Sequence, residues 1–459
     1  MSNGTSYRRG SVFGGLLLIS IGGLFLYANL HPEFSPWPLL ATWWPLIIIF
    51  WGLGKLVDYL LLRGTPEAAA VTRLSAGDIF GLIFLILLGT TFSQIHKGIG
   101  WRGEGIRIGG EELSCLFANQ YEFSDDVELS VTAPGPFSLT NTRGDIAVRP
   151  STDGRIRIHA TKHICATTET EARTLSEKVL PLLLAEGAGY DFHWDLPSGS
   201  SGLQRADLKV EVPKGIPVRV SGSRGEVALS GIQTDVTVES ERGDVALSDI
   251  TGNVEMEIRR GDVAVSDVNG SVTIRGRGGE ISLSRISGAA TLDGEYYGPI
   301  QFSAIAGPAR FTSRRTTFES ARIEGELTVD SGELSLRGVP GDVTLLTRDK
   351  EIEIAGVSGA VRVTNRNGRV VVRSAQPPAS PIEVENERGS IEIFLPGASG
   401  FQITASARKG DITSEFSGLD SQRQREHGPD EILTGSVGNG RASIRLTTSY
   451  GTIAIRRSG

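Results

Sequence analysis

The octapeptide Gly225-Glu-Val-Ala-Leu-Ser-Gly-Ile232 decides the fold, because it recurs three times at intervals of 18 residues. The copies begin at Gly243, Gly261 and Gly279. Weaker copies begin at Gly144, Gly298, Gly332, Gly368, Gly389, Gly410 and Gly451. Self-similarity at a fixed short period is typical of repeat architectures, in which each unit packs on its neighbours.

Each unit contains two stretches in which apolar and polar residues alternate. Val245 and Leu247 alternate with Ala and Ser, and past a turn Val254, Met256 and Ile258 alternate with Glu. This period of two is typical of half-buried strands. Because 18 residues are too few for a propeller blade, we predict a mainly β fold, a β-solenoid in which each strand pairs with its equivalents about 4.8 Å above and below.

The glycine that opens each unit is predicted to turn the chain at a corner of the solenoid, where unusual backbone angles are needed. The predicted corner residues are Gly144, Gly225, Gly243, Gly261, Gly279 and Gly298. Arg-Gly-Asp occupies three of these corners, beginning at Arg143, Arg242 and Arg260. Since the equivalent unit carries Arg224-Gly-Glu226, we interpret the motif as a corner with stacked charges rather than as an integrin-type adhesion motif.

One segment interrupts the repeats. Thr168-Glu-Thr-Glu171 is a capping box followed by apolar residues at helical spacing. It predicts one α-helix over about 168–186, although Pro181 lies where it could end the helix early. We expect this helix to dock on an apolar end or flank of the solenoid and to protect its strand edges.

The first hundred residues contain three apolar segments long enough to cross a bilayer, at about 12–30, 39–62 and 79–95. We interpret Lys55 and Asp58 as the cytoplasmic end of the second span rather than as an intramembrane relay. A cleaved signal peptide is the alternative for the first segment, but its apolar core is long and no small-residue cleavage site follows Leu30. We therefore divide the chain into a membrane region (1–100), a linker (101–124) and a solenoid domain (125–459).

The loop charges predict the orientation of these spans. Arg8 and Arg9 precede the first span, Arg63 and Arg73 lie between the second and third, and the first loop has neither Lys nor Arg. Because cytoplasmic loops are enriched in Lys and Arg, this places the solenoid outside the cytoplasmic membrane. A disulfide between Cys115 and Cys165 is possible there, since an oxidising compartment permits it.

Composition argues against several classes of function. A net charge of −7 disfavours nucleic acid as a partner. With six histidines and no nucleophile or phosphate-binding motif, we predict no catalytic residue and no cofactor. His159, His163 and Cys165 share parity along one strand and form a zinc-compatible set. They lack a fourth ligand nearby, so we predict no metal ion there, and the calcium β-roll repeat is absent.

Two family resemblances follow from these motifs. Gly14-Gly-Leu-Leu-Leu-Ile-Ser-Ile-Gly-Gly-Leu24 and Trp44-Pro-Leu-Ile-Ile-Ile-Phe-Trp-Gly-Leu-Gly54 resemble the membrane region shared by LiaI and LiaF, bacterial cell-envelope stress proteins. The repeats, with Val212-Pro-Lys-Gly215 before them, resemble the LiaG-type β-strand-repeat domain, called toastrack and described as adhesin-like. The resemblance implies a membrane-anchored solenoid in envelope-stress sensing, often beside two-component systems, and no catalytic residues.

Two functions remain open. In the first, the chain is a non-enzymatic sensor or regulator of the cell envelope. Its solenoid face then binds an envelope polymer or a partner protein, and its helices couple to a membrane partner such as a two-component histidine kinase. In the second, it is a structural or adhesin-like surface module that the helices merely anchor in the lipid bilayer. Three spans with glycine-rich faces favour the first, because an anchor needs one helix.

Overall fold

The computed structural model describes residues 107–108, 111–112, 118–187, 189–196, 203–424, 430–440 and 442–458. The predicted membrane spans at 12–30, 39–62 and 79–95 lie outside the described residues. Within the described part, no helix is both long and apolar enough to cross a membrane. A two-stranded antiparallel sheet joins β1 (Arg107–Ile108) to β2 (Glu111–Glu112).

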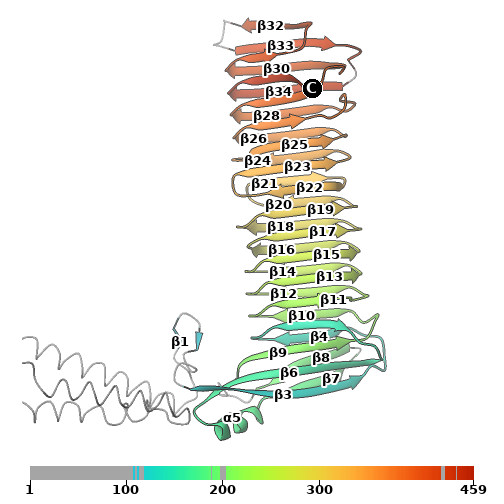
Figure 1. Ribbon diagram of the computed structural model, residues 1–459, viewed down its shortest axis with the longest axis vertical. Coiled ribbons are helices and arrows are strands. Elements are labelled where there is room, and N and C mark those ends of the chain that lie inside the picture. The colour runs from blue at the N-terminus through green and yellow to red at the C-terminus, as the bar shows by residue number, and fades with distance from the viewer. Residues whose placement is uncertain are drawn as a thin grey trace, which may run out of the picture. The chain divides into compact units, whose positions relative to one another are not determined.

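The remaining strands form two long sheets, here called sheet I and sheet II, whose strands are stacked one above another (Figure 1). In spatial order, sheet I contains β3 (Asn119–Ser130), β6 (Arg155–Ala166), β9 (Leu203–Val212), β5 (Ile146–Pro150), β11 (Val227–Ser230), β13 (Val245–Thr251), β15 (Val263–Asn269), β17 (Ile281–Ile286), β19 (Ile300–Ile305), β22 (Ile323–Val329), β23 (Glu333–Val339), β25 (Glu351–Val357), β27 (Val370–Arg373), β29 (Ile391–Pro396), β35 (Ile453–Ser458) and β31 (Ile412–Ser414).

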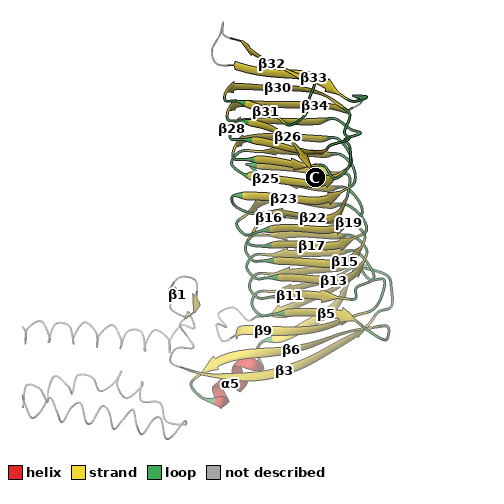
Figure 2. Cartoon of the chain, turned by 45° about the horizontal axis from the view of Figure 1, so that its top comes forward, coloured by secondary structure: helices red, strands yellow, loops and turns green. Residues whose placement is uncertain are grey.

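The pairings of sheet II connect β7 (Leu180–Glu186), β8 (Gly189–Asp195), β4 (Phe137–Asn141), β10 (Val218–Gly222), β12 (Val236–Ser240), β14 (Val254–Ile258), β16 (Val272–Gly278), β18 (Ala290–Tyr296), β20 (Ala309–Thr312), β21 (Thr316–Ser320), β24 (Val343–Thr347), β26 (Val361–Asn367), β28 (Ile382–Arg388), β34 (Ala442–Tyr450), β30 (Phe401–Lys409), β33 (Asp430–Val437) and β32 (Leu419–Gln424). Figure 2 shows the loops running along the edges of the two sheets.

The predicted solenoid is therefore present. Val245 of β13 lies beside Val227 of β11 and Val263 of β15, each 18 residues away, in parallel register. The inward side chains of both sheets form one continuous apolar core. Val245 and Met256 are each only 1% exposed, as the alternating pattern predicts.

Sheet I carries a repeated bulge that the alternating sequence pattern does not predict. Asp249, Asp267, Arg285 and Ala304 occupy equivalent positions and all have φ between 52° and 57°. The left-handed residue turns the chain so that the next residue, such as Ile250, points into the core. Such angles are unfavourable for residues other than glycine.

The predicted corner glycines fall into two groups. Gly144, Gly225, Gly243 and Gly261 have φ between 121° and 147°, as expected for a strained corner. Gly279 and Gly298 do not adopt a positive φ, so the expected reason does not apply to them. A side chain at either position would collide with the preceding rung: a Cβ on Gly279 would lie 2.1 Å from Asp262 Oδ1.

One rung runs in the opposite direction to the rest. The hairpin from β20 to β21 reverses the chain, and a second hairpin from β22 to β23 restores the original direction. As a result β21 and β22 are antiparallel to the strands on both sides of them. The predicted run of parallel rungs is therefore interrupted between residues 316 and 329.

A second departure lies near the C-terminal end of the solenoid. Strands β34 and β35 do not stack on the outside of β30 and β31, which precede them in the chain. Instead β34 lies between β28 and β30, and β35 lies between β29 and β31. A later segment of the chain thus completes an inner rung.

The predicted helix is shorter than expected. Helix α5 spans Glu169–Ser176, with the side chain of Thr168 accepting the backbone N–H of Glu171 at 3.3 Å. The prediction of helix to residue 186 is wrong, because β7 begins at Leu180. Pro181 favours an extended conformation at the residue before it. The helix belongs to a different compact unit from the solenoid, so its predicted docking stays a prediction.

The predicted linker 101–124 also ends too late. Strand β3 begins at Asn119, and its alternation of half-buried and exposed side chains continues without a break through residue 124. The sequence does not reveal this start, because polar residues dominate 119–126.

Candidate functional site

The acids of the Arg-Gly-Asp motifs form a ladder of hydrogen bonds along one corner of the solenoid. Asp244 Oδ1 accepts the backbone N–H of Asp262 at 2.9 Å, and Asp262 Oδ1 accepts that of Glu280 at 2.8 Å. Asp145 Oδ1 accepts the N–H of Glu226 at 3.0 Å. The motif therefore holds successive rungs together, since one carboxylate oxygen of each of these acids accepts a backbone N–H of the following rung.

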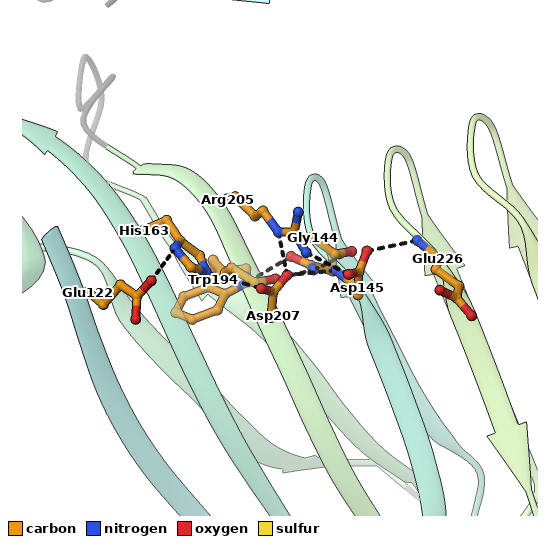
Figure 3. Close-up of polar contacts among 10 residues, drawn as sticks. Glu122, Gly144, Asp145, His163, Trp194, Arg205, Asp207 and Glu226 are labelled. Atoms are coloured by element: carbon orange, nitrogen blue, oxygen red, sulfur yellow. Dashed lines mark hydrogen bonds and ion pairs between the residues drawn. The ribbon is translucent and has the colours of Figure 1, made fainter. Parts of the chain in front are cut away.

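The ladder begins in a denser polar cluster at the N-terminal end of the solenoid (Figure 3). Asp207 Oδ1 accepts the N–H of Asp145 at 2.9 Å and Arg205 Nε at 2.6 Å, while Asp207 Oδ2 lies 3.0 Å from His163 Nε2. Arg205 also contacts Asp145 Oδ2 at 2.5 Å. The cluster connects β6 and β9 to the corner that precedes β5.

This cluster changes the acidity of Asp207. Partial burial by itself would raise the pKa of the Asp207 carboxyl. The hydrogen bonds from Arg205, from the Asp145 N–H and from His163 act in the opposite direction and outweigh it, so the pKa of Asp207 lies below its usual value. Asp207 is therefore a carboxylate that supports the first corner rather than a proton donor.

A second set of charges joins the edge strand β3 to β6, here called the β3–β6 ion-pair ladder. On the outer face, Glu122 lies 3.4 Å from His163, Asp126 lies 2.7 Å from His159, and Glu128 contacts Arg155 at 2.9 Å and Arg157 at 3.6 Å. The acids all come from β3 and the bases all come from β6. Electrostatic complementarity thus selects the partner of the edge strand.

The same two strands share an ion pair whose lysine is buried and whose aspartate is half-buried. Lys162 is 2% exposed, and its Nζ lies 2.6 Å from Asp125 Oδ2 and donates to the carbonyl oxygen of Val179 at 3.0 Å. A buried ammonium group is costly unless it is paired and hydrogen-bonded. Lys162 therefore fixes β3, β6 and the start of β7 to one another.

The residues of the zinc-compatible set, His159, His163 and Cys165, have other bonding partners. His159 and His163 lie on the outer face of β6, and each contacts a carboxylate of a neighbouring strand. Cys165 is disulfide-bonded. Cys115 lies outside the described residues, so the Cys115–Cys165 pairing stays a prediction. No group of three or more His, Cys, Asp or Glu side chains within the described ranges is arranged to hold a metal ion.

The β3–β6 ion-pair ladder was not predicted, although the sequence carries a signal for it. Residues 122–128 carry four acids, and residues 155–163 carry five bases at alternating or adjacent positions. Opposite charge on two strands of equal length favours their pairing. The 18-residue period gives no sign of this pairing, because neither strand belongs to an 18-residue unit.

Comparison with known families places these features in context. Residues 300–456 match the family model described as Toastrack DUF4097. Residues 12–56 match the LiaI-LiaF-like transmembrane region. Both resemblances inferred from the sequence are thereby confirmed, and the second match implies that the chain is anchored in a membrane. The toastrack match begins at β19, so the most regular repeats, 225–286, lie before it.

Solved structures are also similar to the chain, at low identity. A proposed cell adhesion protein from Clostridium sporogenes is 11% identical and covers 74% of this chain and 100% of its own, with a TM-score of 0.17. A proposed adhesin from Bacteroides fragilis is 12% identical and covers 73% of this chain and 97% of its own, with a TM-score of 0.20. TM-scores this low carry no conclusion about function. The search of curated proteins found no match.

Proposed function

We propose that the chain is a non-enzymatic, membrane-anchored sensor or regulator of the bacterial cell envelope. In this proposal the solenoid lies outside the cytoplasmic membrane and binds an envelope component or a partner protein. The membrane region couples that binding to a membrane partner such as a two-component histidine kinase. The single observation that carries the proposal is the match of residues 12–56 to the LiaI-LiaF-like transmembrane region in the same chain as a toastrack match.

The geometry of the solenoid supports this role. Its rungs are held by backbone ladders, corner carboxylates and a continuous apolar core, so the domain is suited to act as a rigid body. Its N-terminal end is fixed by the β3–β6 ion-pair ladder. Since β3 is the first long strand after the membrane region, a force on the solenoid would reach that region through β3.

Two observations bear on the placement of the solenoid and on the adhesin-like alternative. The disulfide at Cys165 supports an extracytoplasmic position, because cytosolic disulfides are rare. The Arg-Gly-Asp carboxylates are engaged in rung-to-rung hydrogen bonds, which weighs against their use in adhesion. Reporter fusions after Ile95 and after Gly459 test the placement, and activity confined to cytoplasmic reporters would contradict it.

The signalling role is tested by exchanging the membrane region. The first hundred residues are replaced by one unrelated anchor helix, and the transcriptional response to cell-wall antibiotics is measured. We expect the exchange to abolish the response while the solenoid remains folded at the membrane. A response that survives the exchange but is lost on deletion of the solenoid would remove the proposed role of the helices and favour the anchored surface module.

A further inference from the structure

A groove lies on the outer face of sheet I, at the N-terminal end of the solenoid. Strands β3, β6, β9 and β5 line it, and its volume is about 600 Å³. This size lies within the range of ligand sites in proteins. The groove is hollow over β5 because Ala147, which faces outward there, lies directly opposite Lys209 of β9 and leaves space above the sheet.

The carboxylates that line this groove are already paired. Asp126 is paired with His159, and Glu128 with Arg155 and Arg157. Glu211 lies 3.2 Å from Arg157. Arg157 is therefore surrounded by acids, since Asp153 contacts it as well. Each of these three groove carboxylates is therefore already neutralised by a base of β6.

Two cations in the groove have no such partner. Lys209 and Arg149 are both exposed, and neither forms an ion pair or hydrogen bond with a side chain of the described residues. They lie on adjacent strands, at diagonal positions, because Arg149 is opposite Glu211 and Lys209 is opposite Ala147. Diagonal positions across neighbouring strands are separated by roughly 7 Å. The spacing suits two successive anionic groups of one chain better than a single anion.

We propose that this groove binds a phosphate-bearing polymer, with Lys209 and Arg149 each contacting one phosphate group. Arginine binds phosphate through a two-pronged hydrogen bond, and lysine binds it as a point charge. A phosphodiester remains ionised across the physiological pH range, so its attraction to both cations is constant. Among the described residues that line the groove there is no Phe, Tyr or Trp, and the imidazole of His159 is engaged by Asp126, so the groove lacks the broad stacking surface typical of single-stranded nucleic-acid sites. This inference rests on the proposed function, because it names the class of envelope component that the solenoid would bind.

The test uses the full chain in phosphatidylcholine nanodiscs and inorganic polyphosphate as the probe, with binding measured by calorimetry. We expect the unmodified chain to bind and its affinity to fall with added salt. The variant Lys209→Gln/Arg149→Gln is expected to bind at least about tenfold more weakly, since each lost contact is charge-assisted. A charge-conserving variant, Lys209→Arg/Arg149→Lys, is expected to retain most of the affinity.

The matched control removes the same two charges elsewhere. Lys214 and Arg219 are exposed and lie outside the groove, so Lys214→Gln/Arg219→Gln should change the affinity by less than about twofold. Equal losses in both double variants, or no loss in the groove variant, would overturn the proposal. Absence of binding by the unmodified chain would do so as well. Circular dichroism of each variant confirms that the strand content is unchanged.

A final experiment distinguishes a polymer ligand from a lipid headgroup, which contains the same phosphodiester group. In phosphatidylglycerol nanodiscs, polyphosphate affinity is expected to fall only by the modest amount that general charge repulsion causes, equally in the unmodified chain and the control variant. Complete competition would assign the groove to lipid and overturn the polymer. The outcome is independent of the helix-exchange experiment, because a chain can signal without this groove and can bind here without signalling.

Discussion

Asp262 Oδ1 accepts the backbone N–H of Glu280, 18 residues later in the chain, at 2.8 Å. The N–H of Asp262 in turn donates to Asp244 Oδ1 at 2.9 Å. Asp262 is thus an acceptor for the rung above and is itself held by the rung below. The acceptors at this corner, Asp145, Asp244 and Asp262, all have the short side chain that this contact requires.

Loss of one such acceptor should weaken the stack measurably. We expect Asp262→Ala to lower the free energy of unfolding by about 1 kcal/mol, the typical worth of one hydrogen bond. Asp262→Asn keeps an acceptor oxygen and should lose less. Chemical denaturation checks both, with Glu257→Ala, an exposed acid on β14, as the control. An equal loss in Asp262→Ala and Glu257→Ala would contradict the role of the corner acid.

The corner glycines should tolerate no side chain. In Gly243→Ala the new Cβ would lie 1.9 Å from the carbonyl oxygen of Gly225, at φ +147°. We expect a loss of stability of more than about 3 kcal/mol, since both rungs must move and the angle is strained. Gly154→Ala is the control, because nothing lies within 4 Å of its Cβ. Thermal unfolding of the two variants should differ strongly, and similar melting temperatures would refute the close approach.

The repeated bulge in sheet I offers a way to stabilise the protein. Ala304 is exposed and has φ 52°, so Ala304→Gly removes backbone strain without removing buried surface. Relief of about 1–2 kcal/mol of strain exceeds the entropic cost of glycine, about 0.5–1 kcal/mol. We expect a net gain of about 0.5–1 kcal/mol in denaturant titrations. Ala246→Gly, in β13, should destabilise by a similar amount, and a loss in both variants would show that the angle at Ala304 is unstrained.

The polar cluster around Asp207, at the corner formed by Gly144, predicts that the stability of the fold depends on pH. Because the pKa of Asp207 is held below the ordinary value of 3.8, its carboxylate stabilises the fold fully above that value. The contribution is lost as the pH falls through the lowered pKa. We expect the melting temperature of Asp207→Asn to change less than that of the unmodified chain when the pH is lowered from about 5 to about 2.5. Parallel curves for the two proteins would contradict this account.

Removal of the buried Lys162 from its ion pair with Asp125 should destabilise the fold. We expect Lys162→Met to lower the free energy of unfolding by about 2–3 kcal/mol, since Asp125 and the Val179 carbonyl both lose their partner. Lys162→Met/Asp125→Leu should recover part of that loss. Arg155→Met, which removes an exposed pair, is expected to cost less than about 1 kcal/mol. If the double variant were the least stable of the three, the pair would not act as a unit.

The repeat could be predicted from the sequence because its physical cause is local. Alternation of Val245 with polar residues gives strands, and an 18-residue period gives parallel stacking. The reversed rung could not be found in this way, because alternation is the same in both directions along a strand. What reverses the chain are the two tight hairpins, at 313–316 and 330–333, whose residues also occur in ordinary solenoid turns.

The candidate site was predicted less completely. The corner role of Gly243 depends on its own rung and could be inferred from the repeat. The contacts of Lys162 and Lys209 depend on strands that lie far apart in the chain, such as β3, β6 and β9. Their pairing follows from three-dimensional neighbours that no period reveals, so the groove and the buried pair emerge only from the structure.

The position of β34 between β28 and β30 has a consequence for biosynthesis. The neighbours of β34 emerge from the ribosome before it does, and until then the edges that will receive it lack their final partner. The upper rungs are thus completed only after residues 442–458 have been made and, if the domain is exported, translocated. Chains halted before that point would present open edges that invite pairing with other molecules.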